Sequence, residues 1–276
     1  MRATTNLLAQ FNNNLNKGIW ASADYYKSFK QSFETKTKAD MTGLDSLFGT
    51  PAPYQVVNGI GIIDFKGFTI NDANPIEELF FGVISLQNFQ KNLAAMVKDD
   101  SVAQCLINFD SGGGYVMGGY ETQQLISELN QVKPIYAYTS GLMCSNAYFI
   151  GSACSKIWAS PSSWVGSIGV YCEYFDLTKA MDEAGIKVTT FQGGSEKTVG
   201  SPYIPLTPEQ SKQIQDDINN QWQEFKQVVR DARGNVNEQF MQGQAFTGVE
   251  AVQMGTNLVD GLCNSLTQIV GLISKS

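Results

Sequence analysis

The chain has 276 residues, of which 43% are hydrophobic, and its formal net charge is -7. This length and hydrophobic content suffice for an α/β domain with a sizeable core. The negative charge argues against nucleic-acid or anionic-membrane partners, which need clustered lysine and arginine. Because the chain contains no histidine, an imidazole base and an imidazole-ligated metal are excluded. The five cysteines are scattered without metal-ligand spacing, and we expect no metal or other cofactor.

Residues 1–50 are polar and are predicted to form an N-terminal arm that is helical or partly disordered. Apolar residues recur there at helical spacing, from Ile19 to Phe33. No secretory signal or membrane-spanning run is apparent, so we expect a cytoplasmic protein without a membrane anchor. Prolines at positions 51 and 53 break the helical pattern, and residues 51–276 are predicted to form the main domain.

The main domain alternates strands with helices. An Asn-Gly turn joins strands at 54–57 and 60–65, and Ser85 is a good N-cap for the helix that follows. The strand at 102–109 is apolar at nearly every position, as in a central parallel strand covered on both faces. Further helices are predicted at 120–129, 145–153, 176–185 and from 208, and further strands at 134–139, 156–160, 186–191 and 257–260. This order predicts an α/β core with helices on both faces of the sheet.

Two later helices have strong start signals. Thr207 is followed by proline at the first helical position and by Gln210 at the third, which together form a capping box. Thr247 and Glu250 form a second capping box at the start of a short helix. The first of these helices is predicted to be the strongest in the chain.

A glycine-rich turn, Asp110-Ser111-Gly112-Gly113-Gly114, follows the apolar strand. It falls at the carboxyl end of that strand, where α/β sheets open their ligand crevice. Without Cβ atoms the chain can turn the N–H of Gly113 outward, as half of an oxyanion hole. A tight turn or a phosphate-binding loop is the alternative, although the Gly-Lys-Ser/Thr of a Walker motif is missing.

Ser145 lies in a strand-to-helix junction made of small residues. Its hydroxyl could simply cap the helix. Small neighbours would also let a peptide approach, and the N–H of Asn146 could complete the oxyanion hole. Cys144 is interpreted as a small buried residue, because no histidine is present to form a thiolate pair with it. If Ser145 is a nucleophile, its base must be a group other than imidazole, and a lysine amine is the obvious alternative.

Lys197 lies in a glycine-rich loop that runs from Gly193 to Tyr203. A loop lysine is ordinarily a solvated surface charge. To act as a base, its amine must be largely desolvated, so that its pKa falls from about 10.4 toward neutrality.

In this order and spacing, the motifs resemble the signal peptide peptidase A and protein C family of Ser-Lys peptidases, from about Tyr54 to Leu262. Besides the glycine turn and the Lys197 loop, the matching stretches are Cys-Ser-Asn-Ala-Tyr at 144–148, Trp-Val-Gly-Ser-Ile-Gly-Val at 164–170 and the terminal signature at 255–260. The resemblance implies a ClpP/crotonase-like fold, with a stacked parallel sheet and covering helices. It makes residues 51–276 the peptidase domain.

By the same resemblance, Ser145 is the nucleophile and Lys197 the general base, while the amides of Gly113 and Asn146 form the oxyanion hole. Ser167 matches a serine that helps to orient the lysine in relatives, with a plain turn hydroxyl as the alternative. The match implies no metal.

Two residues depart from the family pattern. Gly112 stands where many relatives have proline, and Asn146 stands where they commonly have glycine or alanine. The first change could loosen the oxyanion turn. The second places a side chain beside the nucleophile and could alter substrate choice.

Within the family, the opening at 54–59 and the spacing from Lys197 to Tyr203 look most like phage head-maturation proteases. This branch implies a homo-oligomer that cleaves scaffold, portal or other capsid precursors in the host cytoplasm, in association with procapsids. The alternatives are a bacterial signal-peptide-peptidase-like protease, a crotonase-type acyl-CoA enzyme, and an inactive capsid assembly factor.

Overall fold

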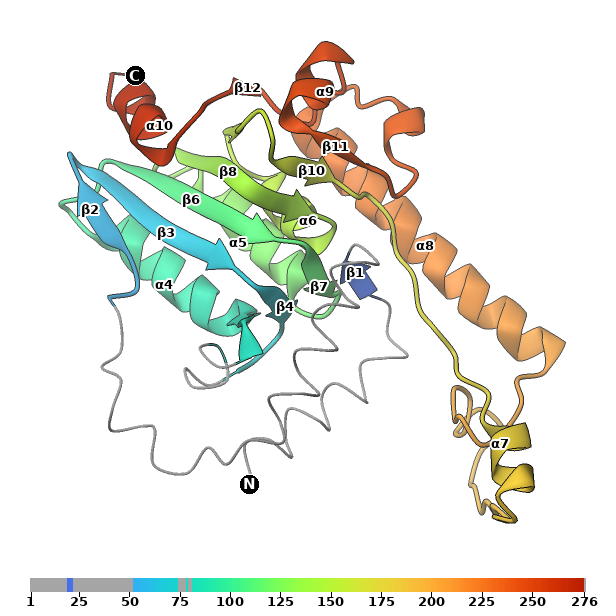
Figure 1. Ribbon diagram of the computed structural model, residues 1–276. Helices are drawn as coiled ribbons and strands as arrows, with labels where there is room; N and C mark the ends of the chain where they lie inside the picture. Colours follow the sequence, from blue (N-terminus) through green and yellow to red (C-terminus); the bar gives the residue numbers. More distant parts are fainter. Residues whose placement is uncertain (1–18, 22–51, 74–77, 79–80, 276) are drawn as a thin grey trace.

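The computed structural model describes residues 19–21, 52–73, 78 and 81–275. A large, mainly parallel sheet runs through the described residues in the order β11-β10-β8-β6-β3-β2, with β9 beside β8 and β12 beside β9 (Figure 1). Its strands are β2 (Gln55–Val57), β3 (Ile60–Lys66), β6 (Gln104–Ser111), β8 (Ile135–Cys144), β9 (Lys156–Ala159), β10 (Trp164–Gly166), β11 (Ala245–Thr247) and β12 (Gly261–Leu262). The edge strands β2 and β11 pair antiparallel with their neighbours. The predicted hairpin and the predicted parallel core are therefore confirmed.

A smaller sheet is built as a continuation of the large one. Its order is β1-β7-β4-β5, from β1 (Ile19–Ala21), β4 (Phe68–Ile70), β5 (Val83–Ser85) and β7 (Gly113–Tyr115). Strand β4 follows β3 after Gly67, and β7 follows β6 after Gly112. A Cβ on Gly67 would lie 2.4 Å from the carbonyl oxygen of Gly82, so only glycine fits where the chain passes into the smaller sheet.

The predicted helical arm is wrong at its one described segment. Residues Ile19–Ala21 form β1, which pairs antiparallel with β7 so that Ala21 faces Gly113. The free edge of β7 offers backbone hydrogen bonds that a helix cannot use, and pairing with that edge outweighs the local helical spacing. The rest of the predicted arm lies outside the described residues.

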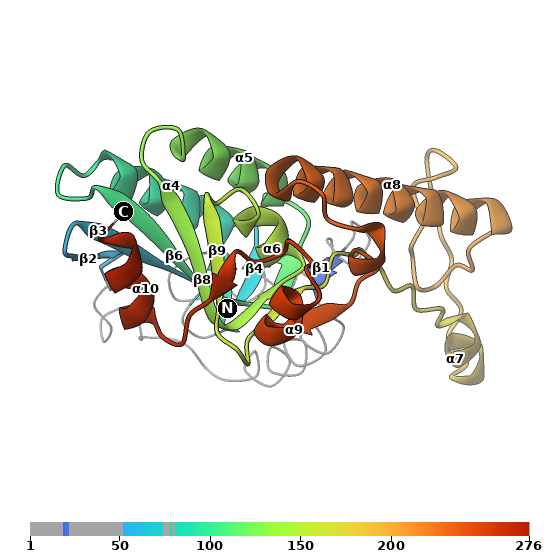
Figure 2. The same cartoon turned by 90° about the horizontal axis from the view of Figure 1, so that it is seen from above.

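Helices cover both faces of the large sheet (Figures 1 and 2). Helices α4 (Leu86–Lys98) and α5 (Gly119–Leu129) lie on one face, and α10 (Leu266–Ile273) lies on the other. The main core forms under α4 and α5, and a smaller cluster around Tyr138 and Ile269 forms under α10. The other helices are α6 (Asn146–Gly151), α7 (Thr178–Glu183), α8 (Pro208–Arg233), α9 (Gly248–Gln253) and the 3₁₀ turn η2 (Glu238–Phe240).

The helix start signals are confirmed. The Ser85 hydroxyl accepts a hydrogen bond from the N–H of Asn88 at the start of α4. Both capping boxes form, from Thr207 to Gln210 in α8 and from Thr247 to Glu250 in α9. These signals act within one turn of helix, so the sequence carries them in full.

The strand predicted at 186–191 is wrong. These residues form no regular structure and are exposed throughout, and Phe191 reaches 93% exposure. They belong to a protruding lobe, defined here as residues 174–207, which contains α7 and lies at the Pro208 end of α8 (Figures 1 and 2). A strand needs a partner edge, and no described strand runs beside this segment.

Candidate active site

Ser145 occupies the sharp turn between β8 and α6. Its φ of 53° and ψ of -123° are unusual for a residue with a side chain, a conformation that costs on the order of 1–3 kcal/mol. Two backbone hydrogen bonds hold the turn, from its N–H to the Gly166 carbonyl at 2.8 Å and from the Phe149 N–H to its own carbonyl at 2.8 Å. Such a strained turn aims a hydroxyl away from the strand and the helix, as a nucleophile requires.

The hydroxyl of Ser145 is buried and has no hydrogen-bond partner among the described residues. It makes no capping bond to α6, so the interpretation of Ser145 as an ordinary N-cap is wrong. A buried polar group without a partner is costly and unusual. The geometry leaves this oxygen free for another group.

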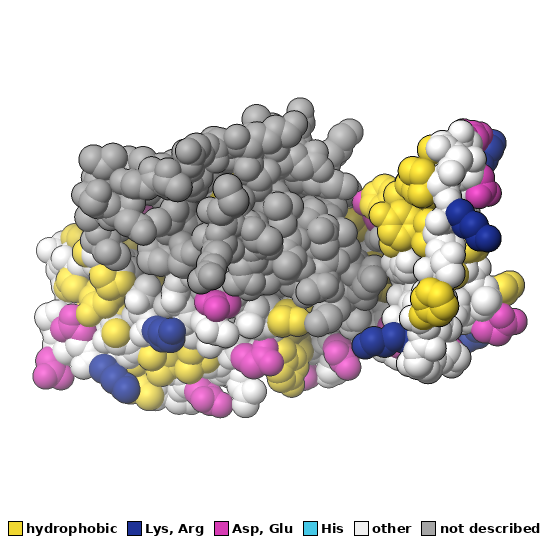
Figure 3. Space-filling view, turned by 90° about the horizontal axis from the view of Figure 1, so that it is seen from below, with side chains coloured by type: hydrophobic (Ala, Val, Ile, Leu, Met, Phe, Trp, Pro, Cys, Tyr) yellow, Lys and Arg dark blue, Asp and Glu magenta, His cyan; other side chains and the backbone are white. Residues whose placement is uncertain are grey.

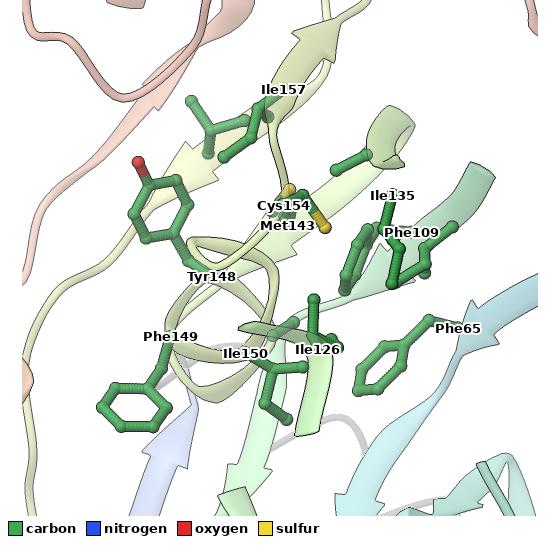
Figure 4. Packing of buried hydrophobic residues seen from close by; sticks show 14 of the residues in the cluster. Phe65, Phe109, Ile126, Ile135, Met143, Tyr148, Phe149, Ile150, Cys154 and Ile157 are labelled. Carbon is green, nitrogen blue, oxygen red and sulfur yellow. The ribbon is translucent and has the colours of Figure 1, made fainter. Parts of the chain in front are cut away.

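Helix α6 is short but fully embedded. All six of its residues are buried, and Tyr148, Phe149 and Ile150 leave it in different directions, into the packed interior (Figure 4). The Phe149 ring packs edge-on against Phe225 of α8 at 5.2 Å between centroids. The Tyr148 hydroxyl donates to the Leu258 carbonyl at 2.8 Å. The core therefore holds the turn at Ser145 from several sides.

The glycine turn lies at the junction between the two sheets. Gly113 has a φ of 99°, which favours glycine. Its N–H donates to the Ser111 hydroxyl at 3.2 Å, and that hydroxyl donates to the Gly67 carbonyl at 2.6 Å. To donate to an oxyanion, the Gly113 N–H would share or release this long contact. The Asn146 N–H lies in the first turn of α6, where backbone N–H groups have no partner within the helix.

Ser167 directly follows β10, which pairs with β8, the strand that ends just before Ser145. Gly166 is paired with Cys144 across β10 and β8, so Ser167 and Ser145 follow directly paired residues. Both serines have positive φ, 52° at Ser167 and 53° at Ser145. The structure thus places Ser167 at the same end of the sheet as Ser145.

Cys144 is not a competing nucleophile. Its side chain is buried, and its thiol points at the Trp164 carbonyl at 3.5 Å. Burial raises the pKa of this thiol to about 12. A thiol with so high a pKa carries almost no thiolate at neutral pH, as the sequence interpretation expected.

Lys197 is not brought to Ser145 by its own chain. It lies exposed on a turn of the protruding lobe, with its N–H donating to the Gly194 carbonyl at 3.3 Å. Helix α8 contacts Phe149 of α6 through Phe225 and extends from there back to Pro208. This stretch of helix spans about 25 Å at 1.5 Å per residue. Figures 1 and 2 show the lobe at that far end, away from α6. A direct hydrogen bond needs roughly 3 Å.

The lobe is held together by hydrogen bonds and has an apolar surface. Its two limbs are tied by the Leu177 N–H, which donates to the Pro202 carbonyl at 2.8 Å, and by the Tyr174 hydroxyl, which donates to the Ser201 carbonyl at 3.1 Å. Hydrophobic side chains gather on it (Figure 3). The exposed ones are Phe175, Leu177, Ile186, Val188, Phe191 and Tyr203. A patch of this kind usually marks an interaction surface.

The terminal signature at 255–260 has a structural role that the sequence did not reveal. The Asp260 carboxylate accepts from the Ile157 N–H at 2.7 Å and pairs with the Arg233 guanidinium at 2.7 Å. Together with the Tyr148–Leu258 bond, these contacts tie β9, α8 and α6 to one segment. Partners so distant along the chain leave no local signal.

Within the described residues, no group of three or more Cys, Asp or Glu side chains is arranged to hold a metal ion. In the same part of the chain, no helix combines the length and hydropathy needed to cross a membrane.

Comparison with known proteins assigns the family. The model of "Peptidase family S49" matches residues 127–272, which is over half of the chain. The chain belongs to peptidase family S49. The matched region contains Ser145, Ser167 and Lys197, whereas Gly113 lies before it.

Two curated S49-like relatives come from phages. Capsid assembly protease C of Escherichia phage lambda is 27% identical over 78% of this chain and 49% of its own length. Head-tail preconnector protein GP5 of Enterobacteria phage P21 is 28% identical over 72% of this chain and 38% of its own length. The S49 chain thus spans half or less of these relatives. The resemblance inferred from the motifs is confirmed at the level of the family.

Among solved structures, an enoyl-CoA hydratase/isomerase family member aligns with 80% of this chain and 73% of its own, at a TM-score of 0.44 and 14% identity. A likeness this distant says nothing of function. The mainly parallel sheet with helices on both faces confirms the α/β fold class that the sequence predicts.

Proposed function

We propose that this S49 chain is a serine endopeptidase in which Ser145 attacks a peptide carbonyl and Lys197 takes the hydroxyl proton. The observation that carries the proposal is the buried Ser145 hydroxyl, which lies on a strained strand-to-helix turn and has no hydrogen-bond partner among the described residues. The N–H groups of Gly113 and Asn146 would stabilise the tetrahedral oxyanion. Collapse of the tetrahedral intermediate breaks the peptide C–N bond, and the protonated lysine gives its proton to the departing amine. The neutral lysine then takes a proton from the water that hydrolyses the acyl-enzyme and returns this proton to the Ser145 oxygen. Because the hydroxyl is buried, a peptide reaches it only when the surrounding segments open.

The proposal includes a second copy of the chain. Lys197 is exposed on a lobe directed away from its own α6, so a neighbouring copy is the natural source of the lysine that meets each Ser145. Packing of the lobe against that copy would bury its apolar side chains and desolvate the amine, as a base requires. Ser167, beside the nucleophile turn, would help to orient the incoming lysine. The enzyme is thus proposed to be a homo-oligomer.

We further propose that the substrates are scaffold, portal or other capsid precursors, and that the enzyme acts in association with procapsids. This part rests on the two phage relatives, whose names refer to capsid assembly and to the head-tail preconnector.

The test is cleavage of candidate capsid precursors by the purified chain, followed by the masses of the products. Ser145→Ala and Lys197→Ala should each abolish cleavage, and a serine-directed phosphonate should label Ser145 in the unaltered chain. Matched controls are Ser152→Ala, a buried serine at the other end of α6, and Lys187→Ala, an exposed lysine of the same lobe. Full activity in Ser145→Ala or Lys197→Ala would refute the dyad.

A further inference from the structure

The side chain of Asn146 connects the nucleophile's helix to the strand of the proposed oxyanion donor. It is fully buried, and its Nδ2 donates to the Thr69 hydroxyl of β4 at 2.8 Å and to the Tyr115 carbonyl of β7 at 2.8 Å. Tyr115 lies two residues after Gly113 on the same short strand, and Asn146 directly follows Ser145. One amide group therefore spans the two halves of the site.

The space around this amide is tightly limited. A Cβ on Gly119 would lie 2.3 Å from the Asn146 Oδ1, and a Cβ on Gly114 would lie 2.2 Å from the Thr69 carbonyl oxygen. Glycines at both positions let α5 and β7 approach the amide closely. Close packing of this kind leaves the linked backbones little freedom to shift.

The chemistry of the contact requires a donor. The Tyr115 carbonyl can only accept, so the amide nitrogen must face it and Oδ1 must point the other way. Oδ1 is then buried with no partner among the described residues. Burial of an acceptor without a partner normally lowers stability. The two hydrogen bonds that Nδ2 donates are therefore the contacts that hold the amide in this orientation.

We propose that Asn146 is a positioning residue whose side chain sets the distance between the Ser145 hydroxyl and the Gly113 N–H. This inference rests on the proposed function and adds a role for the Asn146 side chain to the role proposed for its backbone N–H. Holding β7 against α6 fixes the oxyanion donor relative to the nucleophile. Loss of the bond therefore raises the barrier to acylation and leaves ground-state peptide binding unchanged.

A purely structural role makes a different prediction. Loss of a buried hydrogen bond would then lower stability, while kcat per folded molecule would stay the same. Asn108 supplies the matched control, because it is 9% exposed and its Nδ2 donates to the Asp64 carboxylate at 2.7 Å, away from β7.

The experiment measures kcat and KM on a peptide substrate for Asn146→Ala, Thr69→Val, Thr69→Ser and Asn108→Ala. Asn146→Ala should lower kcat roughly ten- to a hundredfold, with KM changed by less than about twofold, because a small misplacement of catalytic groups costs up to that factor. Thr69→Val replaces the accepting hydroxyl with a methyl group of similar size and should also lower kcat, whereas Thr69→Ser keeps the hydroxyl and should retain kcat. Asn108→Ala should lose stability with kcat unchanged. If Asn146→Ala fails to fold, the Thr69 pair still decides the question.

The rate at which a serine-directed phosphonate labels Ser145 provides a second measurement, and it should fall by the same factor as kcat. A less stable Asn146→Ala or Thr69→Val with kcat within about twofold of the unaltered chain would overturn the positioning role. That outcome leaves the proposed function intact if Ser145→Ala is inactive. Absence of both cleavage and labelling in the unaltered chain would instead refute the proposed function, and this inference with it.

Discussion

Mixing two inactive variants tests whether Ser145 and Lys197 meet between copies. Ser145→Ala chains keep the lysine, and Lys197→Ala chains keep the nucleophile. The helix from Phe225 to Pro208 places the lobe about 25 Å from the contact with α6, far beyond the roughly 3 Å that proton transfer requires. If each site takes its lysine from a neighbour, mixed oligomers regain active sites that neither variant has alone.

The size of the recovery follows from counting sites. In a randomly assembled 1:1 mixture, half of the sites have an intact serine and half of those receive an intact lysine, so activity returns to about one quarter of that of the unaltered enzyme. The fraction does not depend on the number of subunits in a closed ring. If the dyad formed within one chain, every site would lack one partner and the mixture would stay inactive.

The assay dissociates the two variants, reassembles them together and follows peptide cleavage across a series of mixing ratios. Activity should peak at equal amounts. As a control, unaltered chains are mixed 1:1 with chains that carry both substitutions. Activity per site should then fall to about one quarter for a dyad between copies, but only to about one half for a dyad within a chain. If the mixture of the two single variants stays inactive and the control retains about half of its activity per site, the dyad forms within one chain and the reasoning is refuted.

Two further predictions concern side chains near the site. Burial raises the Cys144 pKa from 9.0 to about 12, so at pH 8 about 1 thiol in 10,000 is ionised and iodoacetamide should leave activity intact; inactivation that Cys144→Ser prevents would contradict this. Asp260→Ala removes the acceptor of the Ile157 N–H and the partner of Arg233, whose side chain is 7% exposed. It should lower the free energy of unfolding in urea by about 1–2 kcal/mol. Glu183→Ala, which removes the exposed ion pair between Lys179 and Glu183 of α7, should change it by less than about 0.5 kcal/mol. Equal effects would argue against a structural role for Asp260.

Much of the fold could be predicted because its signals are local. The helix caps at Ser85, Thr207 and Thr247 each depend on residues within one turn, and all three form. The apolar strand at 102–109 likewise signals burial on both faces, and β6 is buried along most of its length. The small residues around Ser145 likewise predicted a strand-to-helix junction, and α6 begins directly after Ser145.

What could not be predicted depends on distant partners. Apolar spacing at 186–191 suggested a strand, but the segment has no neighbouring edge and is exposed. The contact from Asn146 to Thr69 joins residues 77 positions apart, and no motif marks either end of it. The position of Lys197 depends on the length and direction of α8, which periodicity alone does not reveal.

The projecting lobe also bears on timing. If each site takes its lysine from a neighbouring copy, as proposed, a dilute chain is inactive and the onset of proteolysis is at least second order in chain concentration. Dispersed copies would then stay inactive during synthesis. Confinement of many copies in one small compartment would be enough to start cleavage, and dispersal of the copies would stop it.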